Sequence, residues 1–442
     1  MATNRRRRVA PKILGALVLL LVAGAVAAYW YARPLLLTGT GYAAHNACAL
    51  QNIAERSTAG DDLPPNPLVP YLQWEVLSDG SVEASLLGIL AKQTAWYTPG
   101  FGCTVADNRP ELPQSAPIET ANPIAEAPTP ASASPQVQQV LDDAFVADLG
   151  TRAVVVVKDG QLVAEQYADG FDSETPQLGW SMAKSATNLL VGRLVATEGI
   201  DIHEPLREQL WLEDDRSQIT VDHLLRMTSG LKWDETYELG TPITEMLYLQ
   251  TDMGQFAASQ ELAHPVGTQE QYSSGSTNIV CRQLLQEVEG DANLPRELLL
   301  APLGLSSAVW ETDEAGTPVC SSYLWATPRD WAALGQFALD DGVASGEPLL
   351  LEGWITESIQ PNDVQEMEEG NFAASWWVNE RADGSLEHPD LPRDAYWMAG
   401  HDGQRVFIIP SEDMVIVRMG FSPGLDGSNW ADLAAELVTA LS

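Results

Sequence analysis

A serine and a lysine lie three positions apart at the start of an apolar segment. Ser181 and Lys184 belong to the stretch GWSMAKSATNLLVGRLVATEG. Residues i and i+3 share one face of an α-helix, so this spacing predicts a hydrogen bond between Oγ of Ser181 and Nζ of Lys184. A serine hydroxyl becomes nucleophilic when a base accepts its proton, and burial can lower a lysine pKa from about 10.4 towards about 7–8. The pair therefore predicts covalent acyl transfer with Ser181 as the nucleophile.

The apolar segment itself predicts a buried helix that holds this pair. Its side chains are apolar on nearly all sides, and Gly199 is a plausible end of the helix. The alternative for Lys184 is an amphipathic lysine whose stem packs while its amine reaches water.

The same spacing recurs in Ser229-Gly230-Leu231-Lys232. Gly230 directly follows the serine and predicts a turn, so Ser229 and Lys232 need not share a helix face. We therefore interpret Ser229 as structural.

Two further segments carry residues that suit acyl transfer. Tyr272 precedes a helical pattern in Tyr272-Ser273-Ser274-Gly275, and a phenol beside an ammonium can relay a proton to a leaving group. Ser274 is placed to hydrogen-bond the lysine amine. His401-Asp402-Gly403-Gln404 opens a strand pattern near the C-terminus. Each has a plain alternative: a core or rim tyrosine, and an Asp-Gly turn.

The elements that must position these residues include two hairpins at opposite ends of one domain. Most of the intervening chain, residues 181–395, has helical and loop patterns. We expect an α/β (α+β) fold in which both ends build one antiparallel sheet, flanked by helices and facing a helical lobe. The expected strands are 153–157, 161–167, 404–409 and 414–419, and the expected closing helix is 430–441.

The N-terminus predicts a membrane segment. Arg5 to Arg8 and Lys12 precede the uncharged apolar run 13–32, long enough to cross a bilayer core of about 30 Å. Trp30 and Tyr31 lie at its far end, where interfacial aromatic residues belong. The basic flank predicts an uncleaved signal anchor with the rest of the chain extracytoplasmic, on the periplasmic side of an inner membrane. The alternative is a cleaved signal peptide, which would release a secreted protein.

Composition limits the partners. Five of the 24 basic residues precede residue 13, so the remainder carries 19 basic and 61 acidic residues, a net charge of −42. Such a charge argues against binding nucleic acid or anionic lipid. The six histidines show no ligand spacing, so we expect neither a metal nor an organic cofactor.

The chain divides by composition into four parts. We expect a basic flank and anchor over 1–33, a small extracytoplasmic region over 34–105, a Pro/Ala-rich linker over 106–139 and a globular domain over 140–442. In an oxidising compartment the four cysteines predict the disulfides Cys48–Cys103 and Cys281–Cys320. Buried free thiols are the alternative.

From about residue 140 onward the chain resembles the serine β-lactamase / penicillin-recognising superfamily. It is most similar to the class C-type branch that holds 6-aminohexanoate-dimer hydrolases and β-lactamase-like esterases. The resemblance rests on five segments in order, which are RAVVVVKDG, GWSMAKS, HLLRMTSGL, YSSGSTN and AGHDGQRVFIIP.

The resemblance implies roles for the candidate residues. Ser181 would be the acylated nucleophile, Lys184 its proton acceptor and Tyr272 the acid/base for the leaving group. Ser274 stands where many relatives have asparagine. In the remaining segment, His401 to Gly403 replaces a Lys-Thr-Gly element, and the backbone N–H groups of Ser181 and Gln404 would form the oxyanion hole.

One departure from the family concerns the substrate. Neutral His401 and the Asp402 carboxylate suit anionic β-lactams poorly. Tyr237 and Asp252 are candidates for the substrate pocket.

The resulting prediction is a serine hydrolase, an esterase or amidase acting on a small-molecule ester or amide. The alternatives are a cell-wall D-peptidase or β-lactamase, a transacylase, and a catalytically idle envelope-binding protein.

Overall fold

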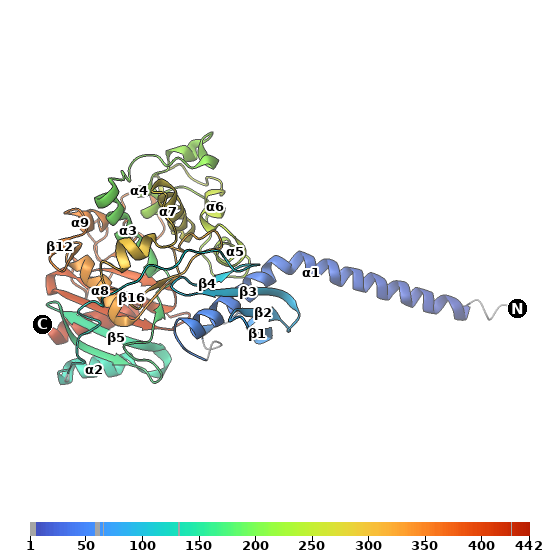
Figure 1. The fold of residues 1–442 in the computed structure, drawn as a ribbon, viewed down its shortest axis with the longest axis horizontal. Helices are drawn as coiled ribbons and strands as arrows, with labels where there is room; N and C mark the ends of the chain where they lie inside the picture. The colour runs from blue at the N-terminus through green and yellow to red at the C-terminus, as the bar shows by residue number, and fades with distance from the viewer. Residues whose placement is uncertain (1–5, 58–61, 65, 131–132, 426) are drawn as a thin grey trace.

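A six-stranded antiparallel sheet forms the centre of the C-terminal part of the molecule in this computed structural model, which describes residues 6–57, 62–64, 66–130, 133–425 and 427–442 (Figure 1). The strand order is β14-β15-β16-β17-β5-β6. Strand β17 pairs with β5, with Ile416 opposite Val156, so the two ends of the domain meet in one sheet as the sequence predicts. The bounds are β5 Thr151–Lys158, β6 Gln161–Tyr167, β14 Trp377–Val378, β15 Tyr396–Gly400, β16 Gln404–Ile409 and β17 Met414–Gly420.

Helices cover both faces of this sheet. Helices α2 (Pro135–Ala144) and α10 (Ser428–Leu441) bury one face, which includes Val154 and Val156. Helix α8 (Pro328–Leu339) packs on the other face, which includes Val155 and Val157. Because neighbouring strand residues point to opposite faces, two covered faces explain the unbroken apolar run of β5.

A helical lobe faces the sheet and contains α3, the buried helix that the sequence predicts. Helix α3 spans Met182–Glu198 and ends at Gly199 in a left-handed conformation. The other helices of the lobe are α4 Val221–Leu225, α5 Pro242–Leu249, α6 Met253–Ala258, α7 Ser274–Glu287 and α9 Trp354–Ser358. Short strands complete the domain, namely β7 Gln177–Leu178, β8 Gln269–Glu270, β9 Val309–Trp310, β10 Leu324–Ala326, β11 Val343–Ala344, β12 Glu347–Pro348 and β13 Glu366–Met367.

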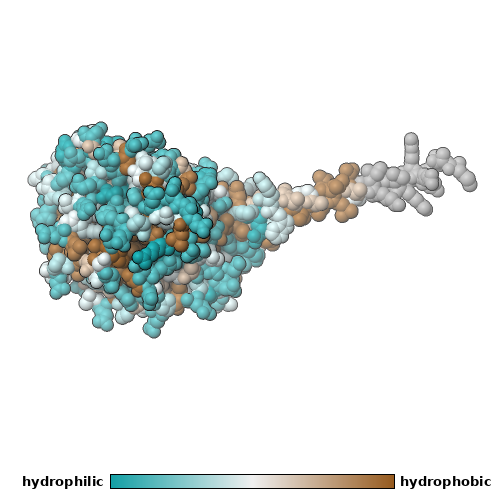
Figure 2. Space-filling model, turned by 90° about the horizontal axis from the view of Figure 1, so that it is seen from above, coloured by the Kyte–Doolittle hydropathy of each residue, from teal (hydrophilic) through white to brown (hydrophobic). Residues whose placement is uncertain are grey.

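Helix α1 spans Arg6–Asn52 and extends well beyond the expected end of the apolar run at Ala32. Arg5 lies outside the described residues. The segment Leu14–Asn52 is long and apolar enough to cross a membrane, and none of its most apolar stretch is buried. Figure 2 shows brown, hydrophobic side chains along the protruding helix and a mostly teal body.

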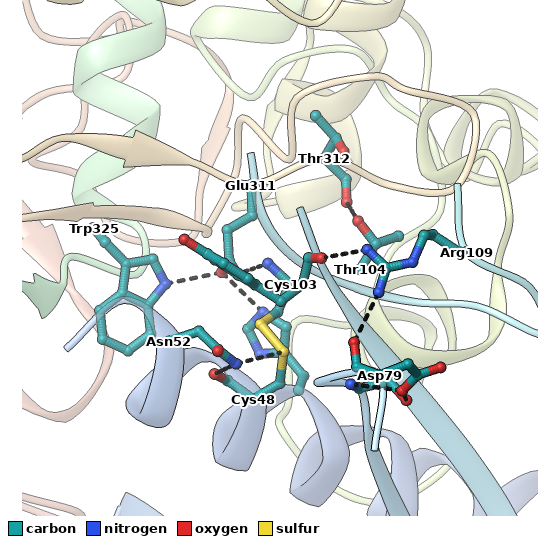
Figure 3. The surroundings of a disulfide bond; sticks show 12 residues. Cys48, Asn52, Asp79, Cys103, Thr104, Arg109, Glu311, Thr312 and Trp325 are labelled. Carbon is teal, nitrogen blue, oxygen red and sulfur yellow. Dashed lines mark hydrogen bonds and ion pairs between the residues drawn. A yellow bond between two sulfur atoms is a disulfide. The ribbon is translucent and has the colours of Figure 1, made fainter. Parts of the chain in front are cut away.

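The second half of α1 packs on a four-stranded sheet of order β1-β2-β3-β4. The strands are β1 Leu72–Val76, β2 Val82–Leu86, β3 Leu90–Thr98 and β4 Gly102–Val105. The predicted disulfide Cys48–Cys103 joins α1 to β4, and Figure 3 shows its surroundings.

The buried carboxylate of Glu311 fastens this N-terminal region to the C-terminal domain (Figure 3). One oxygen accepts from the backbone N–H of Cys103 at 2.6 Å, and the other accepts from Nε1 of Trp325 at 2.8 Å. His45 of α1 contacts the same carboxylate at 2.9 Å. A buried charge is tolerated when several donors satisfy it, so these contacts make a specific connection between the two regions.

The extended segment between the two regions also lies on the domain. Asn122 donates from its backbone to the carbonyl of Gly304 at 3.0 Å and from its side chain to Asp330 at 2.5 Å. Nη1 of Arg329 donates to the carbonyl of Ala127 at 2.7 Å.

Candidate active site

Ser181 lies immediately before α3, and Lys184 lies one turn into it. The Nζ of Lys184 is 2.9 Å from Oγ of Ser181, as the spacing predicts. It is also 2.8 Å from Oγ of Ser274 and 3.2 Å from the carbonyl oxygen of Ser321. The lysine is only 1 % exposed, and burial lowers its pKa to about 8. With that pKa, roughly a tenth of the lysine is neutral at pH 7 and about half at pH 8, and the neutral amine is the form that a general base requires.

The carboxylate of Glu235 is the charged group nearest to this lysine among the described ion pairs. Its Oε1 lies 3.8 Å from Nζ of Lys184 and favours the protonated amine, in opposition to burial. The same carboxylate accepts from Oγ of Ser274 at 2.5 Å and from the backbone N–H of Ser274 at 2.8 Å. Nε1 of Trp233 donates to it at 2.6 Å. Glu235 therefore orients Ser274, which in turn contacts the lysine.

Tyr272 lies beside the lysine on the loop that precedes α7. The Nζ of Lys184 is 4.8 Å from the centre of the Tyr272 ring. The ring is held by Phe372 and Trp377, whose ring centres are 5.5 and 5.7 Å away. Burial, with a further contribution from the Glu235 charge, raises the pKa of the Tyr272 phenol, so this group stays protonated.

The disulfide Cys281–Cys320, which the sequence also predicts, holds together two of the segments that surround Lys184. Cys281 is on α7, the helix that begins at Ser274, and Cys320 precedes Ser321, whose carbonyl contacts the lysine. The disulfide therefore links the segments that carry Ser274 and Ser321, two of the three residues whose oxygen atoms contact Lys184.

The backbone around the serine is tightly constrained. Trp180 has a φ of 48°, a left-handed conformation that is uncommon for a residue with a bulky side chain. A Cβ atom on Gly400 would lie 2.1 Å from the carbonyl oxygen of Gly179, so only glycine permits this approach. The end of β15 therefore contacts the turn that carries Ser181.

The His401–Gly403 turn follows directly after Gly400. Asp402 has a φ of 57°, and Nη1 of Arg418 donates to the carbonyl of Gly403 at 3.0 Å. His401 stacks on Tyr237 with ring centres 4.5 Å apart and meets the edge of Trp180 at 5.7 Å. The structure thus brings the predicted His401 and Tyr237 together beside the nucleophile.

Gln404 uses its side chain within the sheet. Its Oε1 accepts from the backbone N–H of Gly420 at 2.9 Å, and its Nε2 donates to the Gly420 carbonyl at 2.5 Å. These bonds between β16 and β17 fix the Gln404 backbone at the end of the His401–Gly403 turn.

Two segments are not part of this group. Asp252 caps α6 through the backbone N–H of Gln255 and pairs with Nε of Arg282 at 3.0 Å, so the structure does not bring it to Ser181. The side chain of Lys232 is 66 % exposed and pairs with Glu261, while Ser229 accepts from the backbone of Leu231. Gly230, at a φ of 74°, makes the turn that the sequence predicts.

Sequence reasoning missed two neighbours of the site. Glu235 lies 39 positions before Ser274 in the sequence. Its only sequence signal is that it is an acidic residue two positions before Tyr237, a candidate pocket residue. Tyr42 comes from α1, where it stacks on Tyr248 at 5.3 Å and meets the edge of Trp180 at 6.0 Å. No local pattern links a residue near an expected membrane anchor to a serine 139 positions later.

Comparisons with known proteins agree with this fold. The Beta-lactamase family model matches residues 142–438. The 6-aminohexanoate-dimer hydrolase of Paenarthrobacter ureafaciens is 24 % identical over 361 residues, which cover 74 % of this chain and 85 % of that protein.

Two solved structures show the same fold. A Bacillus anthracis protein assigned as a 6-aminohexanoate-dimer hydrolase superposes with a TM-score of 0.58 at 22 % identity, covering 73 % of this chain and 90 % of that one. EstCE1, a hydrolase with promiscuous acyltransferase activity, superposes with a TM-score of 0.54 at 15 % identity, covering 69 % and 97 %.

The fold is that of the β-lactamases and penicillin-binding proteins. The chain belongs to the Beta-lactamase family, because the family model matches well over half of its length.

Proposed function

We propose that this protein is a serine hydrolase that cleaves a small ester or amide through an acyl-enzyme on Ser181. The observation that supports this most strongly is the buried Lys184 amine, 2.9 Å from the Ser181 hydroxyl and with a pKa lowered to about 8. An amine in that state can accept the serine proton at the moment of attack.

The chemistry runs in two halves. Oγ of Ser181 forms a bond to the substrate carbonyl carbon while its proton passes to Nζ of Lys184. The bond to the leaving alcohol or amine then breaks, and the leaving group takes a proton. A water molecule next forms a bond to the acyl carbon and loses a proton to the same base. The bond between the acyl carbon and Oγ of Ser181 then breaks, Oγ takes that proton from the base, and the acid is released. No group outside the protein, substrate and water is needed for this balance.

Tyr272 is the proposed proton donor to the leaving group. Its phenol stays protonated because burial and the Glu235 charge raise its pKa. Lys184 lies against its ring, so the proton that the lysine takes from Ser181 has a short route to the departing atom.

The backbone N–H groups of Ser181 and Gln404 are the proposed oxyanion hole. Two contacts support this assignment. Gly400 closely approaches Gly179, and the Gln404 side chain hydrogen-bonds Gly420, which fixes the Gln404 backbone. One such donor contributes roughly 3–4 kcal/mol to lowering the acylation barrier.

We also propose that α1 remains uncleaved and anchors the enzyme on the extracytoplasmic side of a membrane. The helix continues from the apolar run into the buried residues around Cys48, which the disulfide fixes to β4. The alternative is a signal peptide removed near Ala28. The N-terminal mass of the membrane-bound protein would distinguish the two.

Hydrolysis of p-nitrophenyl acetate and of the matching anilide tests the proposed reaction. We expect turnover by the wild type, no burst of product from Ser181→Ala and near-normal turnover from Ser229→Ala. Unchanged turnover by Ser181→Ala would overturn the proposal. A penicillin that forms a stable adduct while both substrates are ignored would favour the cell-wall alternative.

A further inference from the structure

The turn between β2 and β3 exposes apolar side chains to an unusual degree. Leu87 is 55 % exposed and Ile89 is 75 % exposed; Ile89 is the most exposed large apolar side chain described after Tyr31, and Leu87 is equalled there only by Leu212. Tyr71, which is also exposed, lies next to this turn, because the backbone N–H of Leu87 donates to its carbonyl at 2.9 Å. Together these residues form an apolar projection that the protein body does not cover.

The backbone of the turn makes leucine a costly choice at position 87. Leu87 has a φ of 54° and Gly88 a φ of 77°. The left-handed conformation favours glycine, asparagine and aspartate, whereas leucine is strained in it. Since more than half of the Leu87 side chain is exposed, burial in the core does not offset that strain. Neither the backbone geometry nor burial within the fold therefore accounts for leucine at this position.

The turn lies beside the exposed part of α1. The backbone N–H of Ala91 donates to Oη of Tyr29 on α1 at 3.2 Å. Tyr29 is followed by the exposed Trp30 and Tyr31, at the end of the apolar run. Tryptophan and tyrosine concentrate at the headgroup level of a bilayer. Figure 1 shows the β1–β3 sheet on the side of the body from which α1 departs.

We propose that the Leu87–Ile89 turn, together with Tyr71, is a second membrane contact that inserts among the lipid headgroups beside α1. The proposal rests on α1 spanning the bilayer. One helix alone would leave the body free to tilt about its point of entry. A second contact fixes which side of the domain, and therefore of the active site, faces the membrane.

The contact is apolar rather than electrostatic. Lys92, the nearest lysine in the sequence, is already paired with Glu83 on the adjacent strand. The body carries a large excess of acidic residues, so anionic lipid would repel it. The contact should therefore form on zwitterionic lipid and survive high salt, unlike polybasic docking.

The test uses the full-length chain in phosphatidylcholine nanodiscs. An environment-sensitive NBD fluorophore is attached to Ile89→Cys without reductant, so that both disulfides persist. The matched control is Leu351→Cys, 52 % exposed and adjacent to α9 and β12, at the end of the body opposite α1 (Figure 1). A third probe, at Trp30→Cys, reports the span itself. Lipids with a doxyl group near the headgroup quench only probes that reach the interface.

We expect at least about twofold quenching at positions 30 and 89 and little at position 351, also in concentrated salt. Adding Leu87→Asp to the Ile89→Cys chain should roughly halve the quenching at 89, and aspartate tolerates the positive φ. Quenching at 30 without quenching at 89 would overturn the second contact and leave the anchor intact. No quenching at 30 would overturn both. A blue-shifted but unquenched probe at 89, dependent on protein concentration, would show that a second copy covers the turn instead.

Discussion

The chain contains two Ser-x-x-Lys segments that the structure places in opposite environments. Lys184 is buried, contacts three uncharged oxygen atoms and has a pKa lowered to about 8. Lys232 is exposed and paired with Glu261, and a glycine turn separates it from Ser229. Identical spacing therefore gives a buried amine with a lowered pKa in one place and an exposed lysine paired with a glutamate in the other. Burial and hydrogen-bond partners, rather than spacing, decide the chemistry.

The two serines should differ most. Ser181→Ala removes the proposed nucleophile, and we expect ester hydrolysis to fall by about a thousandfold or more, since residual rates come from binding and oxyanion stabilisation alone. Ser229→Ala should change the rate by less than about twofold, since substitutions away from the reacting group seldom do more. Steady-state kinetics on p-nitrophenyl acetate measure both rates. Equal losses in the two variants would show that the two serines do not differ in their role.

The two lysines should differ in their effect on pH dependence. The proposed active form of Lys184 is the neutral amine, so acylation should rise with pH and level off above about 8. Lys184→Met should abolish this rise and slow acylation by about 10²–10⁴-fold, the usual range for a general base. Lys232→Met should leave the profile in place. A profile that is flat from pH 6 to 9 in the wild type would contradict the role of Lys184.

The carboxylates next to the lysines provide a sharper comparison. Glu235 favours the protonated form of Lys184, so Glu235→Gln should move the rise in activity to lower pH. The same change weakens the bonds to Ser274, and we expect a rate loss of about 10- to 100-fold from those charge-assisted bonds. Glu261→Gln, beside Lys232, should neither move the pH profile nor lower the rate. If the rise in activity of Glu235→Gln moved to higher pH, the claim that Glu235 favours the protonated form of Lys184 would be wrong.

The smallest expected effect concerns Tyr42 of α1. Its ring contacts Trp180, the strained residue before the nucleophile, and no such support surrounds Ser229 in the described contacts. Tyr42→Ala should lower kcat/KM by about threefold to tenfold, because an aromatic pair contributes ~0.5–1.5 kcal/mol. The control is Trp74→Ala on the exposed strand β1, which should not alter kcat/KM. Tyr42→Ala with normal kinetics would show that α1 does not influence catalysis.

The sequence predicts the parts of this molecule that local patterns control. The Ser181–Lys184 contact follows from helix geometry, and the hairpins at both ends follow from apolar runs separated by turns. The ordered motifs, more than any single one, indicate the family that the comparison confirms.

What the sequence does not predict depends on contacts between distant segments. Glu235 reaches the site from a loop 51 positions after Lys184, and no periodicity marks it. Helix α1 continues beyond its expected end, through Pro34, because its later residues pack on the β1–β4 sheet. Tertiary packing thus outweighs the local tendency of proline to end a helix.

The most direct test of the central claim is the intact mass of the full-length protein after exposure to a fluorophosphonate, measured between pH 6 and 9. The account predicts one adduct per chain, located on Ser181, that forms faster as pH rises towards 8 and is absent from Ser181→Ala. An adduct on Ser229, or none on folded wild-type protein, would contradict it.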